Sequence, residues 1–361
     1  MASVPEKFLA MTTKKATQKD IARRAGVSQS LVSLVMSEAS APVAAETREN
    51  ILAAARDLGY PLGRREKKSR GRRLLAYIRP LIKREHKFDD PFLDSYEHFY
   101  DAIQNCLVEN AYAAGFEMIV RPYTHPAEVS HWLIEWGVEG VIWHSEDTSL
   151  AEWIIARYPM VQVNRHSGIP ADSVLPNQEE IVRLAFNHLR QNGHDRIALL
   201  SQARTDTAVR ERNQAYRACM KEHNFPPYEK WMHLEDLDEI ADLLVARDPS
   251  GPTALILGDM QALYLQNKLR KAGFVLPNDL SMVGIDNVSA SEFSHPRLTS
   301  IDLQIKEIAN AVIAAMRARL NRTAGAMKKI EVSPRLVSRE SVFQNVVQMI
   351  PLLLAVLTLG S

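Results

Sequence analysis

The sequence has few cysteines and no long apolar run. Its two cysteines, Cys106 and Cys219, lie far apart and lack the spacing of metal ligands. A disulfide framework is therefore excluded, and a reducing compartment is indicated. No stretch reaches the roughly 18 unbroken apolar residues of a membrane-spanning helix, and the first residues lack the apolar core of a secretory signal. We expect a cytoplasmic protein with no membrane partner.

Motifs of catalysis and cofactor binding are also absent. The sequence contains no GxSxG, HExxH, Walker or CxxC motif, and its acidic and histidine residues form no recognisable constellation. We therefore expect no enzyme activity, no cofactor and no metal site. With 361 residues, 46% of them apolar, the chain is long enough for more than one domain.

Charge is distributed unevenly along the chain. Residues 1–73 contain 15 basic and 7 acidic residues, whereas the remainder contains 29 basic and 36 acidic residues. A basic head on an acidic body indicates a polyanionic partner for the head alone. An ordinary basic surface is the alternative that composition leaves open.

The stretch ATQKDIARRAGVSQSLVSLVM, residues 16–36, predicts two short helices joined by a tight turn at Gly26. Thr17 and Ser28 stand where helix caps are expected. A third helix fits Glu46 to Leu58. Three short helices with a tight turn between the first two predict a helix-turn-helix, with a plain three-helix bundle as the alternative.

A helix-turn-helix docks on DNA through helix ends and one exposed helix face. Helix N-termini bind phosphate oxygens, so Thr17 and Ser28 are predicted to contact the DNA backbone. Gln can read adenine through two hydrogen bonds, and Ser can contact several base edges. The predicted face of the second helix consists of Gln29, Ser30, Ser33 and Leu34.

The same stretch, followed by PVAAETRENILAAARDLGY, resembles the headpiece of the lactose-repressor (LacI/GalR) family of bacterial transcription regulators. The resemblance implies that Gln29 and Ser30 read bases. It also places Leu34 at a reading position where Arg is common, which replaces a guanine contact by an apolar one. Ala44 stands where a capping Ser is usual. Because numbering in this family usually starts shortly before the Thr17 position, Met11 is an alternative start.

A basic segment follows the third helix. Residues 64–73 hold seven basic residues and one acidic residue, which favours phosphate contacts over a merely solvated linker. The family resemblance implies a hinge helix here that inserts a Leu into the minor groove. The stretch between Leu62 and Leu74 is shorter than the family's hinge, contains Gly63 and Gly71, and has no Leu, so hinge-helix formation stays open. The predicted phosphate contacts are Arg64, Arg65, Lys67, Lys68, Arg70, Arg72 and Arg73.

From Leu74 onward, short apolar runs alternate with helical stretches. RRLLAYIRP, FEMIVRPY, VEGVIWHS and PMVQVNR predict the strands of a first lobe; RIALLS, KWMHLE, TALILGD and SMVGID predict those of a second. Alternating strands and helices predict an α/β fold with parallel sheets covered by helices. Two such lobes imply a cleft beyond the carboxyl ends of the strands.

The body also resembles the core of the same family, most clearly in HLRQNGHDRIALLS, AVRERNQAYRACM and LRKAGFVLPNDLSMVGIDN. The resemblance implies a two-lobed, periplasmic-binding-protein-like fold that supplies a dimer interface. It implies three crossings between the lobes, near residues 163–166, 288–292 and 322–327. Three crossings form a hinge on which the lobes can close around a ligand.

By the same resemblance, Arg210 and Asp286 hold a small-molecule effector, with an interlobe salt bridge as the alternative. An arginine fork and a carboxylate together suit a polyol, a sugar or a small anion. His144 and Asn164 end two first-lobe strands and are predicted to contact the ligand, and Trp143 to stack on a sugar face. Structural packing is the alternative for these three.

Two departures from the family pattern concern the cleft. Gly258 stands where an Asn commonly supports the ligand, and Pro176 replaces an Asp. The effector is therefore atypical or the cleft is silent, and its identity is left open.

We predict a sequence-specific transcription regulator: a dimeric repressor that binds a palindromic double-stranded DNA operator and responds to a sugar-like effector. A ligand-binding protein, or a regulator with a silent cleft, is the alternative. The apolar tail leaves dimer and tetramer open. The predicted parts are a flexible N-terminal extension (1–15), the helix-turn-helix domain (16–62), the basic linker (63–73), the body (74–342; lobe one about 74–163 and 293–322, lobe two about 164–291 and 323–342) and the tail (343–361).

Overall fold

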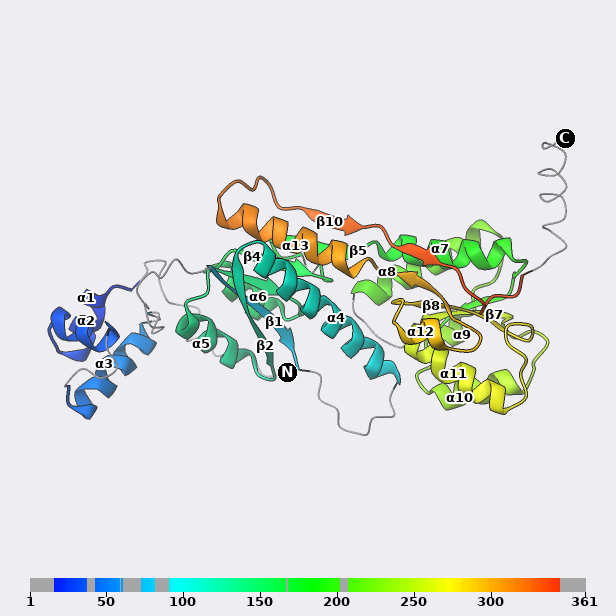
Figure 1. Cartoon of the computed structure of the whole chain (residues 1–361), viewed down its shortest axis with the longest axis horizontal. Coiled ribbons are helices and arrows are strands. Elements are labelled where there is room, and N and C mark those ends of the chain that lie inside the picture. Colours follow the sequence, from blue (N-terminus) through cyan, green and yellow to red (C-terminus); the bar gives the residue numbers. More distant parts are fainter. Residues whose placement is uncertain are drawn as a thin grey trace.

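The computed structural model describes residues 16–37, 43–58, 60, 73–81, 91–166, 168–201 and 207–344. The predicted extension 1–15, the basic linker up to residue 72 and the tail from residue 345 lie outside the described residues. Figure 1 shows a small helical head followed by a larger body of two lobes. Within the described residues, no helix is both long and apolar enough to cross a membrane.

The head consists of α1 (Gln18–Ala25), α2 (Gln29–Ser37) and α3 (Ala45–Asp57). The predicted cap of α1 is present, because Thr17 Oγ1 accepts from the Asp20 amide and the Asp20 carboxylate accepts from the Thr17 amide. Gly26 ends α1 with a φ of 68°, in the left-handed region. The three helices share an apolar core of their own, which confirms the helix-turn-helix. That core contains Ile21, Ala22, Val32, Val35, Ile51, Ala54 and Ala55.

Lobe one is a six-stranded parallel sheet with the order β10-β5-β4-β3-β1-β2. Along β1, Leu75 and Tyr77 face one apolar layer while Ala76 and Ile78 face the other. Helices therefore cover both faces, α4 and α13 on one and α5 and α6 on the other. The elements are β1 (Arg73–Pro80), α4 (Pro91–Ala113), β2 (Phe116–Tyr123), α5 (Pro126–Trp136), β3 (Gly140–Trp143), α6 (Thr148–Ile155), β4 (Met160–Val163), β5 (Asp172–Pro176), α13 (Ile305–Leu320) and β10 (Lys329–Val332).

Lobe two is a five-stranded sheet with the order β11-β9-β8-β7-β6, parallel except for the pairing of β11 with β9. Helices again cover both faces, α7 and α8 on one and α10 and α11 on the other. Two parallel sheets with helices on both faces confirm the predicted fold class. The elements are α7 (Gln178–Gln191), β6 (Ile197–Leu199), α8 (Thr207–Glu222), α9 (Glu229–Met232), α10 (Leu237–Val245), β7 (Ala254–Gly258), α11 (Asp259–Lys271), β8 (Ser281–Ile285), α12 (Ala290–Phe293), β9 (Thr299–Asp302) and β11 (Arg335–Val337).

The chain crosses between the lobes later than the sequence predicts. The crossings follow β5, lie between β9 and α13, and lie between β10 and β11, rather than near residues 163–166, 288–292 and 322–327. The difference arises because β5, β9 and β10 are short strands that mix polar and apolar residues, so the sequence pattern does not identify them as strands. Each of them adds an edge or a neighbour to its sheet before the chain leaves the lobe.

One predicted strand is a helix in the structure. Residues 230–232 of the segment KWMHLE belong to α9, and only Met232 and Leu234 of its apolar residues are buried. Its alternation of apolar and polar residues fits a strand, but β6 forms the edge of its sheet and no strand from this segment pairs with it. A short helix that inserts Met232 into the core is the result.

Candidate DNA interface and ligand cleft

The second helix of the head exposes the predicted base-reading residues on one face. Gln29, Ser30 and Ser33 are exposed, and the Leu34 residue is 38% exposed. Val32 and Val35 alternate with them and are buried in the core of the head. The helix therefore presents one amide, two hydroxyls and one apolar side chain outward, a set that can hydrogen-bond base edges and contact a methyl group.

The two predicted backbone-contacting residues stand at helix N-termini. Thr17 caps α1, and Ser28 Oγ accepts a hydrogen bond of 3.2 Å from the amide of Leu31 in α2. Both residues are exposed, so the ends of α1 and α2 are open to a partner. A helix N-terminus with exposed amides suits a phosphate oxygen.

Arg73 belongs to the body rather than to the linker. It is the first residue of β1, and its guanidinium donates to Glu139 at 2.8 Å and to Asn321 at 3.0 Å. It also lies over the ring of Phe116. These contacts commit its side chain to lobe one, which corrects its assignment as a phosphate contact. Arg64, Arg65, Lys67, Lys68, Arg70 and Arg72 lie outside the described residues.

A cavity between the lobes receives three of the five predicted effector residues. His144 follows β3, Asn164 follows β4, and Asp286 follows β8. All three stand at the carboxyl ends of parallel strands, where binding sites of open α/β sheets form. Asn164 and Asp286 adopt positive φ values of 53° and 114°, so each bends the chain sharply as the strand ends.

Trp143 and Arg210 do not line this cavity, which corrects their assignment. Trp143 is fully buried and stacks on Tyr123 in the layer between the sheet and α5 and α6. Successive strand residues point to opposite faces, so Trp143 points away from the layer that Ile142 enters. Arg210 is exposed on α8 and donates to Thr207 Oγ1 at 3.0 Å.

Arg212 takes the place predicted for Arg210. It lines the cavity, and its Nε donates to Gln178 Oε1 at 2.6 Å. Two residues along a helix turn by about 200°, so the two arginines of α8 face different sides. Helical spacing could have identified the correct one, because Arg212 lies three residues after buried Val209 and four before buried Tyr216.

Asp286 lines the cleft, and the carboxyl group of Asp259 is buried near it. Burial, assisted by the nearby Asp259 carboxylate, raises the pKa of Asp286 to about 8, and Arg212 opposes this rise. Burial also raises the pKa of Asp259 to about 6, opposed by hydrogen bonds from Ser291, Ser300 and the Val288 amide. Asp286 is therefore largely uncharged at neutral pH and can donate as well as accept a hydrogen bond.

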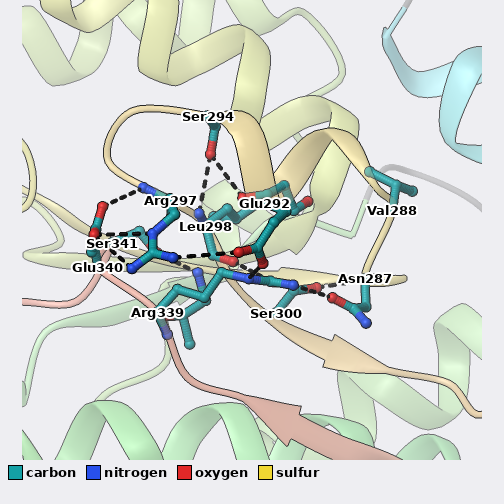
Figure 2. Close-up of polar contacts among 12 residues, drawn as sticks. Asn287, Val288, Glu292, Ser294, Arg297, Leu298, Ser300, Arg339, Glu340 and Ser341 are labelled. Atoms are coloured by element: carbon teal, nitrogen blue, oxygen red, sulfur yellow. Dashed lines mark hydrogen bonds and ion pairs between the residues drawn. The ribbon is translucent and has the colours of Figure 1, made fainter.

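A network of charged residues holds the loop that follows Asp286 (Figure 2). Arg339 donates to Asn287 Oδ1 at 2.8 Å, to Glu292 at 2.7 Å and to the Leu298 carbonyl at 2.6 Å. Its side chain is only 10% exposed. Arg297 joins the same network through Glu292 and Glu340. The segment around Arg339 thereby fixes the loop that follows Asp286.

Gly258 and Pro176, the two departures from the family pattern in the cleft, each have a local structural role. Gly258 lines the cavity as the last residue of β7, directly before α11, and its amide donates to Gln261 Oε1 at 3.0 Å. Pro176 is the last residue of β5 and pairs with Val332 of β10. Within the described part of the chain, no group of three or more His, Cys, Asp or Glu side chains could hold a metal ion.

Two family descriptions match the chain. Residues 17–61 match the bacterial regulatory proteins of the lacI family, and residues 186–342 match a periplasmic binding protein-like domain. Among curated proteins, the transcriptional repressor PurR of Vibrio vulnificus (strain CMCP6) is 27% identical over 351 residues, which cover 91% of this chain and 98% of the relative. PurR of Vibrio campbellii (strain ATCC BAA-1116) is 28% identical over the same shares.

Solved structures share the fold. The complex of the transcriptional regulator CelR with cellobiose has a TM-score of 0.63 and 23% identity, and covers 90% of this chain and 99% of its own. The Lac repressor bound to ONPG in its repressed state has a TM-score of 0.63 and 21% identity, and covers 91% and 100%. The matches extend over both the head and the body. The chain therefore belongs to the LacI family of bacterial regulatory proteins.

Proposed function

We propose that the chain is a cytoplasmic repressor that binds a palindromic DNA operator as a dimer. The observation that carries the proposal is the exposed face of α2, where Gln29, Ser30, Ser33 and Leu34 lie outward from a separately packed head. One helix-turn-helix reads only a few base pairs, so two heads on a palindrome increase affinity and specificity. The sign of regulation follows the curated relatives, which are named as repressors.

The same proposal assigns a small-molecule effector to the interlobe cavity. Arg212 and Asp286 belong to lobe two, whereas His144 and Asn164 belong to lobe one. A ligand held by both lobes stabilises one relative orientation of the lobes and so shifts the population of DNA-competent dimers. CelR was solved with cellobiose and a CCPA regulator from Weissella paramesenteroides with glucose, both polar small molecules.

A ligand-binding role without regulation is the competing function, and catalysis is not part of either. The head distinguishes the two, because an exposed recognition face has no use in a protein that only binds a ligand. The basic segment 64–72 adds sequence-independent phosphate affinity in the proposal. The proposal concerns the dimer and not any larger oligomer.

Selection of binding sites from a random DNA duplex pool at moderate salt tests the proposal. We expect the full-length protein to enrich a palindrome whose half-sites lie about one helical turn apart. A CpG step at its centre would indicate that the DNA is kinked there. Binding to every duplex alike, with strong salt dependence and no enriched sequence in the presence or absence of cell metabolite extract, would contradict the proposal.

The two arginines of α8 test the effector site. Compounds that raise the thermal midpoint of the protein are first identified in a library of small polar metabolites. We expect Arg212→Gln to abolish the shift caused by such a compound, because its guanidinium lines the cavity. Arg210→Gln is the matched control on the same helix and should keep the shift. Equal loss in both variants would place the ligand outside the cavity.

A further inference from the structure

A carboxylate of lobe one lies at the N-terminus of a helix in lobe two. Glu146 follows β3, and its Oε1 accepts a hydrogen bond of 3.4 Å from the backbone amide of Thr207. Thr207 is the first residue of the 16-residue helix α8. The first amides of a helix have no partner inside it, and its positive dipole end attracts anions. The same Oε1 lies 3.6 Å from Nε of Arg165. One carboxylate oxygen therefore faces two groups that favour negative charge.

Glu146 neutralises Arg165 incompletely. The Arg165 side chain is 8% exposed, and its Nε has no hydrogen-bond partner within the described structure. Its NH1 donates to the carbonyl of Asn164 at 2.7 Å. A separation of 3.6 Å is too long for a hydrogen bond, and Glu146 itself remains 45% exposed. A buried guanidinium without a well-placed anion is costly, so this site favours a better-placed negative group.

His144 offers a further donor in the same cavity. Its ring is fully buried, its Nδ1 lies 2.7 Å from the hydroxyl of Tyr77, and its Nε2 has no hydrogen-bond partner among the described residues. Burial, together with Arg165 and Arg79, lowers the pKa of His144, so the ring is neutral. In the tautomer in which the Tyr77 hydroxyl donates to Nδ1, Nε2 carries the proton and can donate to a ligand.

The charges that line the cavity are unbalanced. Arg165 and Arg212 are its cationic lining residues, and Asp286 is its single acidic one among the described residues. Asp286 is largely protonated at neutral pH, as its raised pKa of about 8 indicates. Arg79, just behind Tyr100, adds a third guanidinium; its Nε is also buried without a partner, and its NH2 lies 3.8 Å from Asp101. With Glu146 and Asp101 counted against the three guanidinium groups, the surroundings of the cavity keep a net positive charge, which attracts an anion.

We propose that the cleft takes a small molecule with a carboxylate or phosphate group, and that this group replaces Glu146 between Arg165 and the first amide of α8. The inference rests on the proposed function of the cleft as an effector site. Glu146 then acts as a built-in competitor that holds the two lobes together in the absence of ligand. The remaining polar part of the ligand lies toward Arg212 and Asp286.

Inorganic phosphate is the first probe, because it carries the proposed charge and no other recognition group. The thermal midpoint is measured as chloride is exchanged for phosphate at constant ionic strength. We expect Glu146→Gln to lower the half-saturating phosphate concentration at least fivefold relative to the unaltered protein, since the competing carboxylate is gone. Glu152→Gln, an exposed acid on α6, is the matched control and should change nothing.

Two further variants separate the cleft from the basic head, which also attracts phosphate. Adding Arg165→Gln to Glu146→Gln should abolish the gain, whereas phosphate bound at the head would stabilise every variant alike. Thr207→Pro removes the amide at the first helical position, where proline is tolerated, and should weaken phosphate binding without unfolding α8. Thr207→Ala keeps the amide and removes only the hydroxyl that accepts from Arg210, so it is the control and should bind phosphate normally. Equal phosphate responses in the unaltered protein and in Glu146→Gln would overturn the proposal.

Matched sugars then distinguish the source of the negative charge. Glucose, glucuronate and glucose 6-phosphate share a ring and differ in their charge. We expect at least one of the two acids to bind tenfold more tightly than glucose, and this preference to disappear in Arg165→Gln. Glucose binding as tightly as both acids would overturn the inference. In that case an enriched palindrome in the DNA selection would leave the proposed function intact.

Discussion

The buried carboxylate of Asp259 packs against Gly284 so closely that no Cβ atom fits between them. Asp259 begins α11 and Gly284 lies within β8, so the contact joins a helix to the strand that carries Asp286. Two serine hydroxyls, of Ser291 and Ser300, each donate to this carboxylate at 2.6 Å. Because those bonds fix its position, Gly284 is required by close approach rather than by backbone conformation.

Gly284→Ala tests this contact. A methyl group at residue 284 would displace Asp259 and meet Leu298 as well. We expect a loss of about 3 kcal/mol in the free energy of unfolding, the upper part of the usual range for overpacking. Urea denaturation measures it. Gly325→Ala is the control, because a Cβ there meets open space and should change stability by less than about 0.5 kcal/mol.

Asp286→Asn tests the raised pKa in the cleft. A carboxyl whose pKa rises from about 4 in the unfolded chain to about 8 in the folded one binds its proton more tightly when folded. Stability is therefore lost as the pH rises from about 4 to about 8. Relative to the unaltered protein, we expect the Asn variant to gain about 4 kcal/mol of stability between pH 5 and pH 8. A parallel pH dependence of the thermal midpoint in both proteins would contradict the assignment.

Arg319 and Asp172 form a nearly buried, two-pronged ion pair. Their side chains are 16% and 6% exposed, with contacts of 2.7 and 2.8 Å. Burial opposes ionisation of Asp172, but Arg319 and the Lys328 amide outweigh it and lower its pKa. Arg319→Met leaves the carboxylate without its partner and should cost about 3 to 5 kcal/mol at pH 7. Adding Asp172→Leu should recover part of the loss; no recovery in urea denaturation would mean that the arginine acts through packing alone.

Gln29→Ala tests the recognition face of α2. Loss of two hydrogen bonds to one base should relax sequence preference at one position per half-site, by about 1 to 3 kcal/mol. Quantitative binding to the selected operator and its single-base variants measures the change. Asn50→Ala, at an exposed position of α3, should keep the preference. If Gln29→Ala kept it too, another face of the head would read the bases.

The fold was predictable where local signals and burial agree. The Thr17 cap, the Gly26 turn and the apolar β8 strand can each be identified from a few consecutive residues. Positions that depend on tertiary contacts were harder. Short strands such as β5 offer only a brief apolar run, residues 174–176, so the predicted crossings lie too early in the chain.

The candidate site was predictable to the level of strand ends but not of helix faces. His144, Asn164 and Asp286 end strands and were placed in the cleft correctly. On α8 the sequence offers two arginines within three residues, and the spacing of Arg212 from the apolar residues Val209 and Tyr216 is the signal that distinguishes them. Arg165 gave no signal, because its burial follows from the way the two lobes meet.

The last two strands complete both sheets, and this has a consequence for synthesis. β10 is the edge of one sheet and β11 the edge of the other, and they lie two residues apart near the end of the described chain. During synthesis, neither sheet can be completed until the residues of β10 and β11 have left the ribosome. The head, with its own core at the start of the chain, can fold as soon as it emerges. A nascent or prematurely terminated chain would thus carry a finished DNA-reading unit on an unfinished body.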